Sequence, residues 1–220
     1  MKKLLIASKS QVASFDIDAQ NCFTPLCPDE LPVEEGHHIA VELNAQAAFA
    51  AFRLGSKDAH SPDAVWVASP ENPMLTPLTG QKNVDLYWPQ HAVPGTHGFA
   101  AIEGLPSPTE YDYYVWKGVE LDLHPYGACF HDFQEKLSTG AIEFLKFNSV
   151  STVIVGGLAT DYCVKTTVLQ LLRAGFKVIL NLAACRGINI KTTQAAIAEM
   201  QAQGAMIIES ANCLKNADEV

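Results

Sequence analysis

Strand-like and helix-like segments alternate through the second half of the chain, and this alternation constrains the fold most. The expected strands are 150–155, 176–182 and 205–208, and the expected helices are 140–147, 160–174 and 191–203. Strands that are separated by helices pair in parallel through right-handed crossovers, with helices on the faces of the sheet. We therefore expect an α/β protein with three layers, α/β/α, around a central, mainly parallel sheet.

Two further strands are expected in the first half, each followed by a charged residue. Residues 12–17 predict a strand that ends at Asp18, and residues 111–116 predict one that ends at Lys117. Parallel strands place all their carboxyl ends on one edge of the sheet, where ligands bind in such folds. We expect Asp18 and Lys117 to lie on that edge.

The remaining organisation of the first half is less regular. Residues 37–52 favour a helix with Gly55 as its stop, and the next strand is ambiguous between 52–56 and 64–68. Residues 69–98 are rich in Pro, Gly and Asn and predict a long irregular segment. Long irregular segments within compact domains are usually functional.

Composition narrows the class of protein. The chain has 220 residues, 48% of them hydrophobic and 18% charged, which is typical of one compact domain spanning 1–220. The net charge of −9 argues against nucleic-acid binding, and no apolar run approaches the ~18 residues of a membrane span.

The apolar run 4–7 is too short for a signal peptide and predicts a start segment or a short first strand. Six scattered cysteines without a secretion signal favour reduced thiols and a cytoplasmic location.

A cysteine follows the strongest strand. The strand 150–155 leads into Gly156 and Gly157, and Cys163 lies near the first turn of the next expected helix. The partial positive charge of a helix N-terminus favours a thiolate, which is the nucleophilic form. On the same edge, the Asp18 carboxylate could accept the thiol proton and later return it. Lys117 would stabilise both the thiolate and the carboxylate. Spacing alone leaves open a turn cap, a solvated lysine and an inert buried thiol.

A second group of residues has the chemistry of a metal site. Asp58 and His60 are two positions apart and can project to the same side of an extended segment, and His91 follows Trp88 and Pro89. A carboxylate and two imidazoles suit zinc, iron or manganese. The alternative is a pair of surface histidines. The other histidines, including His124, are expected to be solvated or locally hydrogen-bonded.

These segments together resemble the isochorismatase-like cysteine hydrolases, and most closely the nicotinamidases. The resemblance covers about residues 12 to 210, in matching order and spacing. The segments that carry it are 15–21 (FDIDAQN), 56–60 (SKDAH), 88–96 (WPQHAVPGT), 116–118 (WKG) and 155–164 (VGGLATDYCV). It implies an isochorismatase-like, Rossmann-like fold and an amidohydrolase that converts nicotinamide to nicotinate and ammonia in NAD salvage.

The resemblance also implies roles for individual residues. Cys163 would form a thioester, Asp18 would shuttle protons and Lys117 would be its cationic partner. A cis peptide bond would precede Ala159, and the N–H groups of Ala159 and Cys163 would bind the oxyanion. Phe23, Trp88 and Tyr126 would line the substrate pocket. Asp58, His60 and His91 would hold one divalent metal ion, with zinc ahead of iron or manganese.

The chain departs from the family at one metal ligand and in the segment 118–130, which contains His124 and Tyr126 as candidate pocket residues. Many nicotinamidases have a further histidine or glutamate shortly after the D-x-H motif, whereas here only Glu71 follows, at a distance. The alternative function is hydrolysis of another small amide, such as pyrazinamide, a carbamoyl compound or a biuret-like compound. The expected partners are a small-molecule substrate and further copies of the chain in a homo-oligomer.

Overall fold

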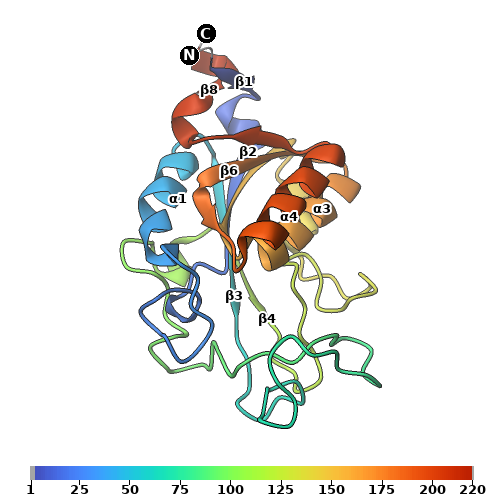
Figure 1. Ribbon diagram of the computed structural model, residues 1–220. Helices are drawn as coiled ribbons and strands as arrows, with labels where there is room; N and C mark the ends of the chain where they lie inside the picture. The colour runs from blue at the N-terminus through green and yellow to red at the C-terminus, as the bar shows by residue number, and fades with distance from the viewer. Residues whose placement is uncertain (1–2, 220) are drawn as a thin grey trace.

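The computed structural model describes residues 3–219, and its centre is a six-stranded sheet in which every pairing is parallel. The strand order is β4-β3-β2-β5-β6-β7 (Figure 1). The strands are β2 (Val12–Ile17), β3 (Phe52–Asp58), β4 (Tyr113–Lys117), β5 (Thr152–Leu158), β6 (Lys177–Arg186) and β7 (Met206–Ile208). The expected mainly parallel α/β sheet is confirmed.

Helices cover both faces of this sheet. They are α1 (Ala40–Ala47), α2 (Ala141–Phe147), α3 (Lys165–Arg173) and α4 (Ile190–Ala202). Helix α1 lies on one face, and α3 and α4 lie side by side on the other (Figure 1). A π-helical turn, Thr160–Val164, precedes α3. Short 3-10 turns span Lys9–Gln11, Asn21–Phe23, Gly36–Ile39, Pro108–Glu110, Ala211–Cys213 and Ala217–Glu219.

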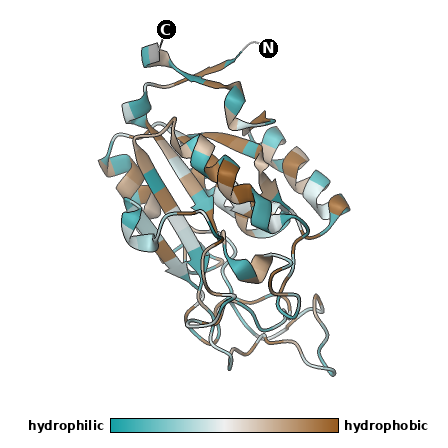
Figure 2. Ribbon diagram, turned by 90° about the vertical axis from the view of Figure 1, so that its left-hand side faces the viewer, coloured by the Kyte–Doolittle hydropathy of each residue, from teal (hydrophilic) through white to brown (hydrophobic). Residues whose placement is uncertain are grey.

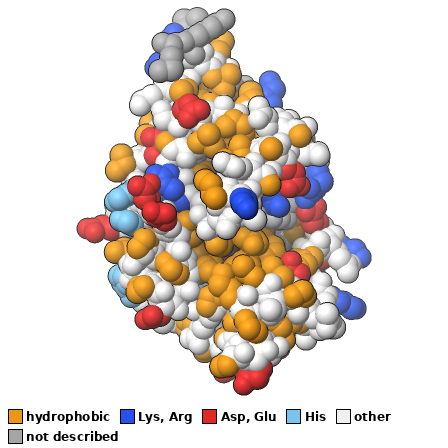
Figure 3. Space-filling model, viewed as in Figure 1, with side chains coloured by type: hydrophobic (Ala, Val, Ile, Leu, Met, Phe, Trp, Pro, Cys, Tyr) orange, Lys and Arg blue, Asp and Glu red, His pale blue; other side chains and the backbone are white. Residues whose placement is uncertain are grey.

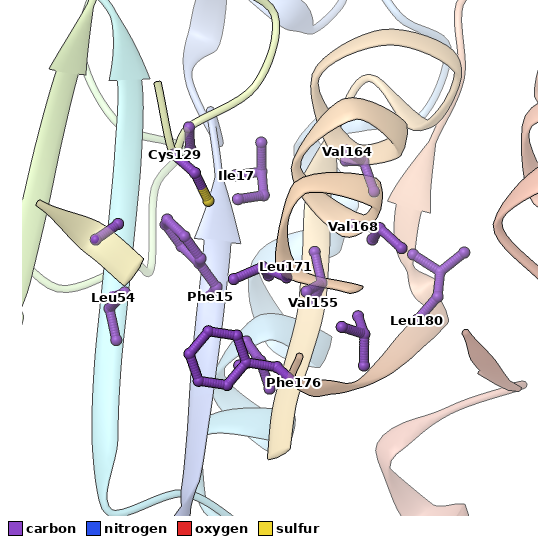
Figure 4. Packing of buried hydrophobic residues seen from close by; sticks show 14 of the residues in the cluster. Phe15, Ile17, Leu54, Cys129, Val155, Val164, Val168, Leu171, Phe176 and Leu180 are labelled. Carbon is purple, nitrogen blue, oxygen red and sulfur yellow. The ribbon is translucent and has the colours of Figure 1, made fainter. Parts of the chain in front are cut away.

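The core forms because strand side chains alternate between the two faces. Phe15 and Ile17 of β2 and Val155 of β5 pack on the side of α3, against Val168 and Leu171 (Figure 4). Burying a side chain of this size stabilises the fold by roughly 1.5–3 kcal/mol relative to exposure. On the surface viewed in Figure 3, hydrophobic side chains gather in the middle, with acidic and basic side chains around them.

The two ends of the sheet differ in character. The chain termini lie at one end, where β1 (Leu4–Ile6) pairs in parallel with β8 (Leu214–Asn216) (Figures 1 and 2). The long loops after β3 and β4 lie at the opposite end, beyond the strand carboxyl ends.

Residues 69–98 contain no helix or strand, as expected. No helix among the described residues combines the length and apolar character needed to cross a membrane.

Two sequence-based expectations near residue 50 are wrong. The expected helix 37–52 is a 3-10 turn followed by α1, which ends at Ala47, and Phe52 begins β3. Gly55 is therefore in the middle of a strand and does not stop a helix. A Cβ there would collide with the ring of Tyr114 on β4, so the glycine permits the strands to pack. Of the two candidates for the next strand, the structure selects 52–58; residues 64–68 form no strand.

The strand boundaries in the second half also extend beyond the sequence pattern. Strand β5 runs through Gly156 and Gly157 to Leu158, and β6 continues to Arg186. Gly157 has φ of 139° and pairs with Ile17, so the glycines continue the strand next to β2. Strand β7 was expected to be the last, yet β8 follows it.

Candidate active site

Three predicted residues, each at or beyond the end of a different strand, meet at the carboxyl edge of the sheet. Asp18 follows β2, Lys117 ends β4, and Cys163 lies in the π-helical turn after β5. The Lys117 Nζ atom is 3.0 Å from Asp18 Oδ2 and 3.7 Å from Cys163 Sγ. All three side chains are buried. The structure therefore brings together the expected acid, cation and thiol.

Lys117 is the electrostatic centre of this cluster. Its ammonium also donates to a carboxylate oxygen of Asp58 and to the carbonyl of Pro125, the latter at 3.0 Å. Burial lowers the pKa of Lys117, but Asp18 and Asp58 outweigh burial and raise the pKa well above its usual value. The ammonium is thus held charged between two carboxylates.

Asp18 is placed to act as a base. Burial raises the pKa of Asp18 to about 6, against the opposing attraction of Lys117. The Ser56 hydroxyl donates to Asp18 Oδ1 at 2.7 Å, which favours the ionised carboxylate. Sequence reasoning did not identify Ser56, because a strand serine has no signal that distinguishes a positioning role. A carboxyl group with this pKa can accept and return protons near neutral pH.

The expected thiolate at Cys163 is wrong for the resting site. Burial raises the pKa of Cys163 well above its usual value, and the attraction of Lys117 does not outweigh burial. The nearby carboxylates of Asp18 and Asp58 raise it further. Cys163 is therefore a thiol at rest, so a base must remove its proton as it attacks.

Cys163 of this cluster lines a narrow pocket, and all the predicted ring-contacting residues line the same pocket. Its lining consists of Phe23, Leu31, Asp58, Trp88, His91, His124, Tyr126, Ala159, Tyr162, Cys163 and Ile188. The Trp88 indole N–H donates to the Tyr126 hydroxyl at 3.1 Å, and that hydroxyl donates to Asp85 at 2.7 Å. The Leu158–Ala159 peptide bond is cis, as the resemblance implied. The pocket has the flat aromatic walls that a small ring requires.

The three predicted metal ligands lie beside the same pocket. The Nε2 atoms of His60 and His91 lie 3.5 and 3.9 Å from oxygens of Asp58. Burial opposes ionisation of Asp58, but Lys117 and the two histidines lower its pKa below the usual range. Burial lowers the pKa of His91 to about 3, so this ring is neutral. One carboxylate and two imidazoles therefore converge as potential ligands.

One further histidine joins this group. His124 was expected to be solvated or locally hydrogen-bonded, but it is buried and neither ring nitrogen has a hydrogen-bond partner among the described residues. Its ligand atom lies within 4.8 Å of those of His60 and His91. Burial lowers the pKa of His124 well below its usual value. Its place depends on loop packing, since the backbone N–H of His124 donates to the Asn83 carbonyl at 2.9 Å. A lone loop histidine carries no sequence signal of this contact. Glu71, the distant candidate, is exposed and accepts a hydrogen bond from Ser69.

Comparison with known proteins places this geometry in a family context. The chain is 28% identical over 221 residues to a nicotinamidase of Acinetobacter baylyi, across 97% of this chain and all of that protein. A solved nicotinamidase and pyrazinamidase of Acinetobacter baumanii superposes with a TM-score of 0.84 at 28% identity, over 93% of this chain and 99% of that one. A pyrazinamidase of Pyrococcus horikoshii, solved in complex with zinc, superposes with a TM-score of 0.70 at 27% identity, over 90% of this chain and 98% of that one.

The family itself is matched over most of the chain. The profile of the Isochorismatase domain covers residues 14–212. This range begins inside β2 and ends beyond β7, and it includes Asp18, Lys117 and Cys163. Because the match takes in nearly the whole central sheet and its functional edge, the chain belongs to the isochorismatase domain family.

Proposed function

We propose that this protein hydrolyses nicotinamide to nicotinate and ammonia through a thioester on Cys163, as an amidohydrolase in NAD salvage. The observation that carries the proposal is the buried Asp18–Lys117–Cys163 cluster, in which Cys163 lines a pocket with aromatic walls. The alignment with a nicotinamidase along its whole length supports the same activity.

In the first half of the reaction, Asp18 accepts the thiol proton as the Cys163 sulfur bonds to the carboxamide carbon. The carbonyl electron pair moves to oxygen, where the N–H groups of Ala159 and Cys163 stabilise the negative charge. Such donors typically contribute ~3–4 kcal/mol to transition-state stabilisation. Asp18 then gives its proton to the amide nitrogen, the C–N bond breaks and ammonia leaves. Lys117 keeps its charge throughout and holds the carboxylate in position.

In the second half, water takes the place of ammonia. Asp18 removes a proton from water as the water oxygen bonds to the thioester carbon. The C–S bond breaks, nicotinate is released, and the sulfur regains a proton from Asp18. The pKa of about 6 at Asp18 suits a group that must both accept and donate within one cycle.

Asp58, His60 and His91 fit a divalent metal ion, because one carboxylate and two inward-facing Nε2 atoms converge beside the pocket. A bound ion would supply a Lewis-acidic contact for the pyridine nitrogen of the substrate, directly or through water. Zinc is the proposed ion, ahead of iron or manganese, and the zinc complex of the Pyrococcus horikoshii pyrazinamidase supports this choice.

The aromatic walls would orient the substrate ring. Phe23, Trp88 and Tyr126 line the pocket together with Cys163. We assign to them the contacts with the flat faces and edge of the pyridine ring. A single domain over 1–220, a cytoplasmic location and a homo-oligomeric state remain predictions within this proposal.

Ammonia release from nicotinamide by the purified protein, supplied with zinc, tests the proposal. We expect steady release by the wild type and none above background by Cys163→Ala. Cys213→Ala is the matched control, because Cys213 is a half-buried cysteine outside the pocket, and it should retain full activity. Absence of ammonia with every divalent metal supplied would refute the proposed activity.

Pyrazinamide is the second candidate substrate. The Acinetobacter baumanii structure is described as both a nicotinamidase and a pyrazinamidase, which favours this particular amide. Nicotinamide, pyrazinamide and a biuret-like amide should be compared at matched concentration. A higher kcat/KM for a compound that lacks the aromatic ring would contradict the assignment of the aromatic walls.

A further inference from the structure

The surroundings of the His124 side chain have a feature that the proposed reaction does not explain. The ring is 4% exposed, and neither of its nitrogens has a hydrogen-bond partner among the described residues. Leaving a buried polar atom without a partner is costly, so such an atom calls for an explanation. The Nε2 atom of His60 is also buried without a hydrogen bond. Unpaired imidazole nitrogens of His60 and His124 therefore lie close together, next to Asp58.

The tautomers of the two neighbouring histidines leave their inner nitrogens free to bind a metal. The His60 Nδ1 atom lies 2.9 Å from the carbonyl of Gly118, and the His91 Nδ1 atom lies 2.7 Å from the carbonyl of Pro89. A carbonyl accepts only, so in each ring Nδ1 carries the hydrogen and Nε2 keeps its lone pair. Backbone carbonyls commonly orient metal-binding histidines in this way.

The loop that carries His124 is held firmly against the rest of the site. The backbone N–H of His124 donates to the Asn83 carbonyl at 2.9 Å, and the Trp66 indole N–H donates to the Leu123 carbonyl at 3.0 Å. The His124 ring stacks on His60, with centroids 4.9 Å apart and planes 20° apart. These contacts bring its ligand atom within 4.8 Å of those of His60 and His91.

We infer that His124 is a direct ligand of the metal, so that three imidazoles and the Asp58 carboxylate form the centre. The inference deepens the proposed function and rests on it for the presence of a metal beside the pocket. His124 thereby supplies the ligand that is missing after the D-x-H motif. A donor set of three nitrogens and one carboxylate favours zinc, iron or cobalt over magnesium or calcium.

The competing role for His124 is packing or stacking on the substrate ring, since its plane is also within 11° of that of Trp88. The variant His124→Phe separates the two roles, because it keeps an aromatic ring in the same space but cannot bind a metal. His124→Ala removes both. His38→Ala is the control, because His38 is exposed and does not line the pocket.

The test is metal binding by chelator-treated protein, without substrate. Zinc affinity is measured by competition with a chromophoric chelator, and cobalt coordination by its visible absorption spectrum. Loss of an outer partner of a ligand typically weakens metal binding about 10–100-fold. We therefore expect His124→Phe and His124→Ala each to bind zinc at least about tenfold more weakly than wild type and to change the cobalt spectrum. His38→Ala should match wild type.

Wild-type zinc affinity and an unchanged cobalt spectrum in His124→Phe would overturn the inference. If both variants fail to fold, X-ray absorption of the zinc-loaded wild type decides, since three coordinated imidazoles support the inference and two refute it. Failure of the proposed function has a different signature: the wild type then binds zinc through His124 but releases no ammonia from nicotinamide.

Discussion

At the scale of single residues, the chemistry depends on opposing effects at buried groups. Burial alone would neutralise Asp18, Lys117 and Cys163, whereas their mutual attraction favours charge. Lys117 and Asp58 remain ionised because each faces an opposite charge, while Cys163 remains a thiol because burial outweighs the pull of one lysine. Asp18 lies between these limits, with a pKa of about 6, so it is the group able to exchange protons.

The state of the thiol is testable by alkylation. A raised pKa leaves little thiolate at pH 7, so iodoacetamide should modify Cys163 no faster than a free model thiol. The half-buried Cys213 should be labelled first. Peptide mapping by mass spectrometry over time measures both rates. Rapid, selective labelling of Cys163 at pH 7 would contradict the assignment of a resting thiol.

The hydrogen bond from Ser56 should help to determine the pH at which activity falls on the acid side of the pH–rate profile. The Ser56 hydroxyl donates to the Asp18 carboxylate at 2.7 Å and so favours the ionised form. In Ser56→Ala the pKa of Asp18 should rise, and because the base must be ionised, the acid limb of kcat/KM should move to higher pH by about one pH unit. At pH values well above the acid limb, the activity of the variant should differ less from that of the wild type. An unchanged acid limb would mean that Ser56 serves packing alone.

At the scale of elements, the junction of β2 and β5 determines where Asp18 and the cysteine turn lie. Gly157 pairs with Ile17, which immediately precedes Asp18. A Cβ on Gly157 would approach the backbone nitrogen and carbonyl carbon of Ile17 to 2.7 Å. The strand can come this close to its neighbour only with glycine at this position.

Gly157→Ala should therefore lower both stability and activity. We expect the free energy of unfolding to fall by about 3 kcal/mol, because backbone atoms of β2 must move. The displaced Asp18 should reduce kcat beyond the loss of folded protein. Gly175→Ala is the matched control: Gly175 also has positive φ, but nothing lies within 4 Å of the added Cβ. It should cost about 1 kcal/mol and leave kcat unchanged. Urea denaturation and kinetics of both variants test this contrast.

The sequence predicted elements best where local pattern and tertiary role agree. The strands ending near Asp18 and Lys117, and helices α3 and α4, are at or close to the predicted positions. The expected helix 37–52 ran too far, because apolar residues at its C-terminal end suited either a helix or β3. Close packing against Tyr114 made Gly55 a strand residue, and this contact is not encoded in neighbouring residues.

At the scale of the whole molecule, an ion pair between a buried carboxylate and a partly exposed arginine, away from the pocket, affects the pH dependence of stability. Asp16 of β2 pairs with Arg53 of β3, whose Nη2 atom lies 2.7 Å away. Burial raises the pKa of Asp16 to about 6, although Arg53 opposes the shift, whereas in the unfolded chain it is near 3.8. Between these values the folded state binds more protons, so this contribution to stability is greatest at low pH and is lost as pH rises through 6.

Asp16→Asn should remove this dependence. Relative to the variant, the wild type should lose up to about 3 kcal/mol of unfolding free energy between pH 4 and pH 7. Urea denaturation of both proteins at several pH values measures the difference, and the comparison cancels other titrating groups. Parallel pH profiles for the two proteins would show that Asp16 stays ionised in the folded state.

The sequence by itself determined the parallel α/β architecture, because the periodicity of each segment and the alternation of strands with helices are visible in neighbouring residues. It also indicated Asp18, Lys117, Cys163, Asp58, His60 and His91 as candidate site residues, since each lies in a motif at or near the carboxyl edge of the sheet, and the structure places them close together. Only the tertiary structure decided the protonation of Cys163, the support from Ser56 and the place of His124. Burial, proximity and loop packing depend on residues far apart in the chain, so no local pattern encodes them.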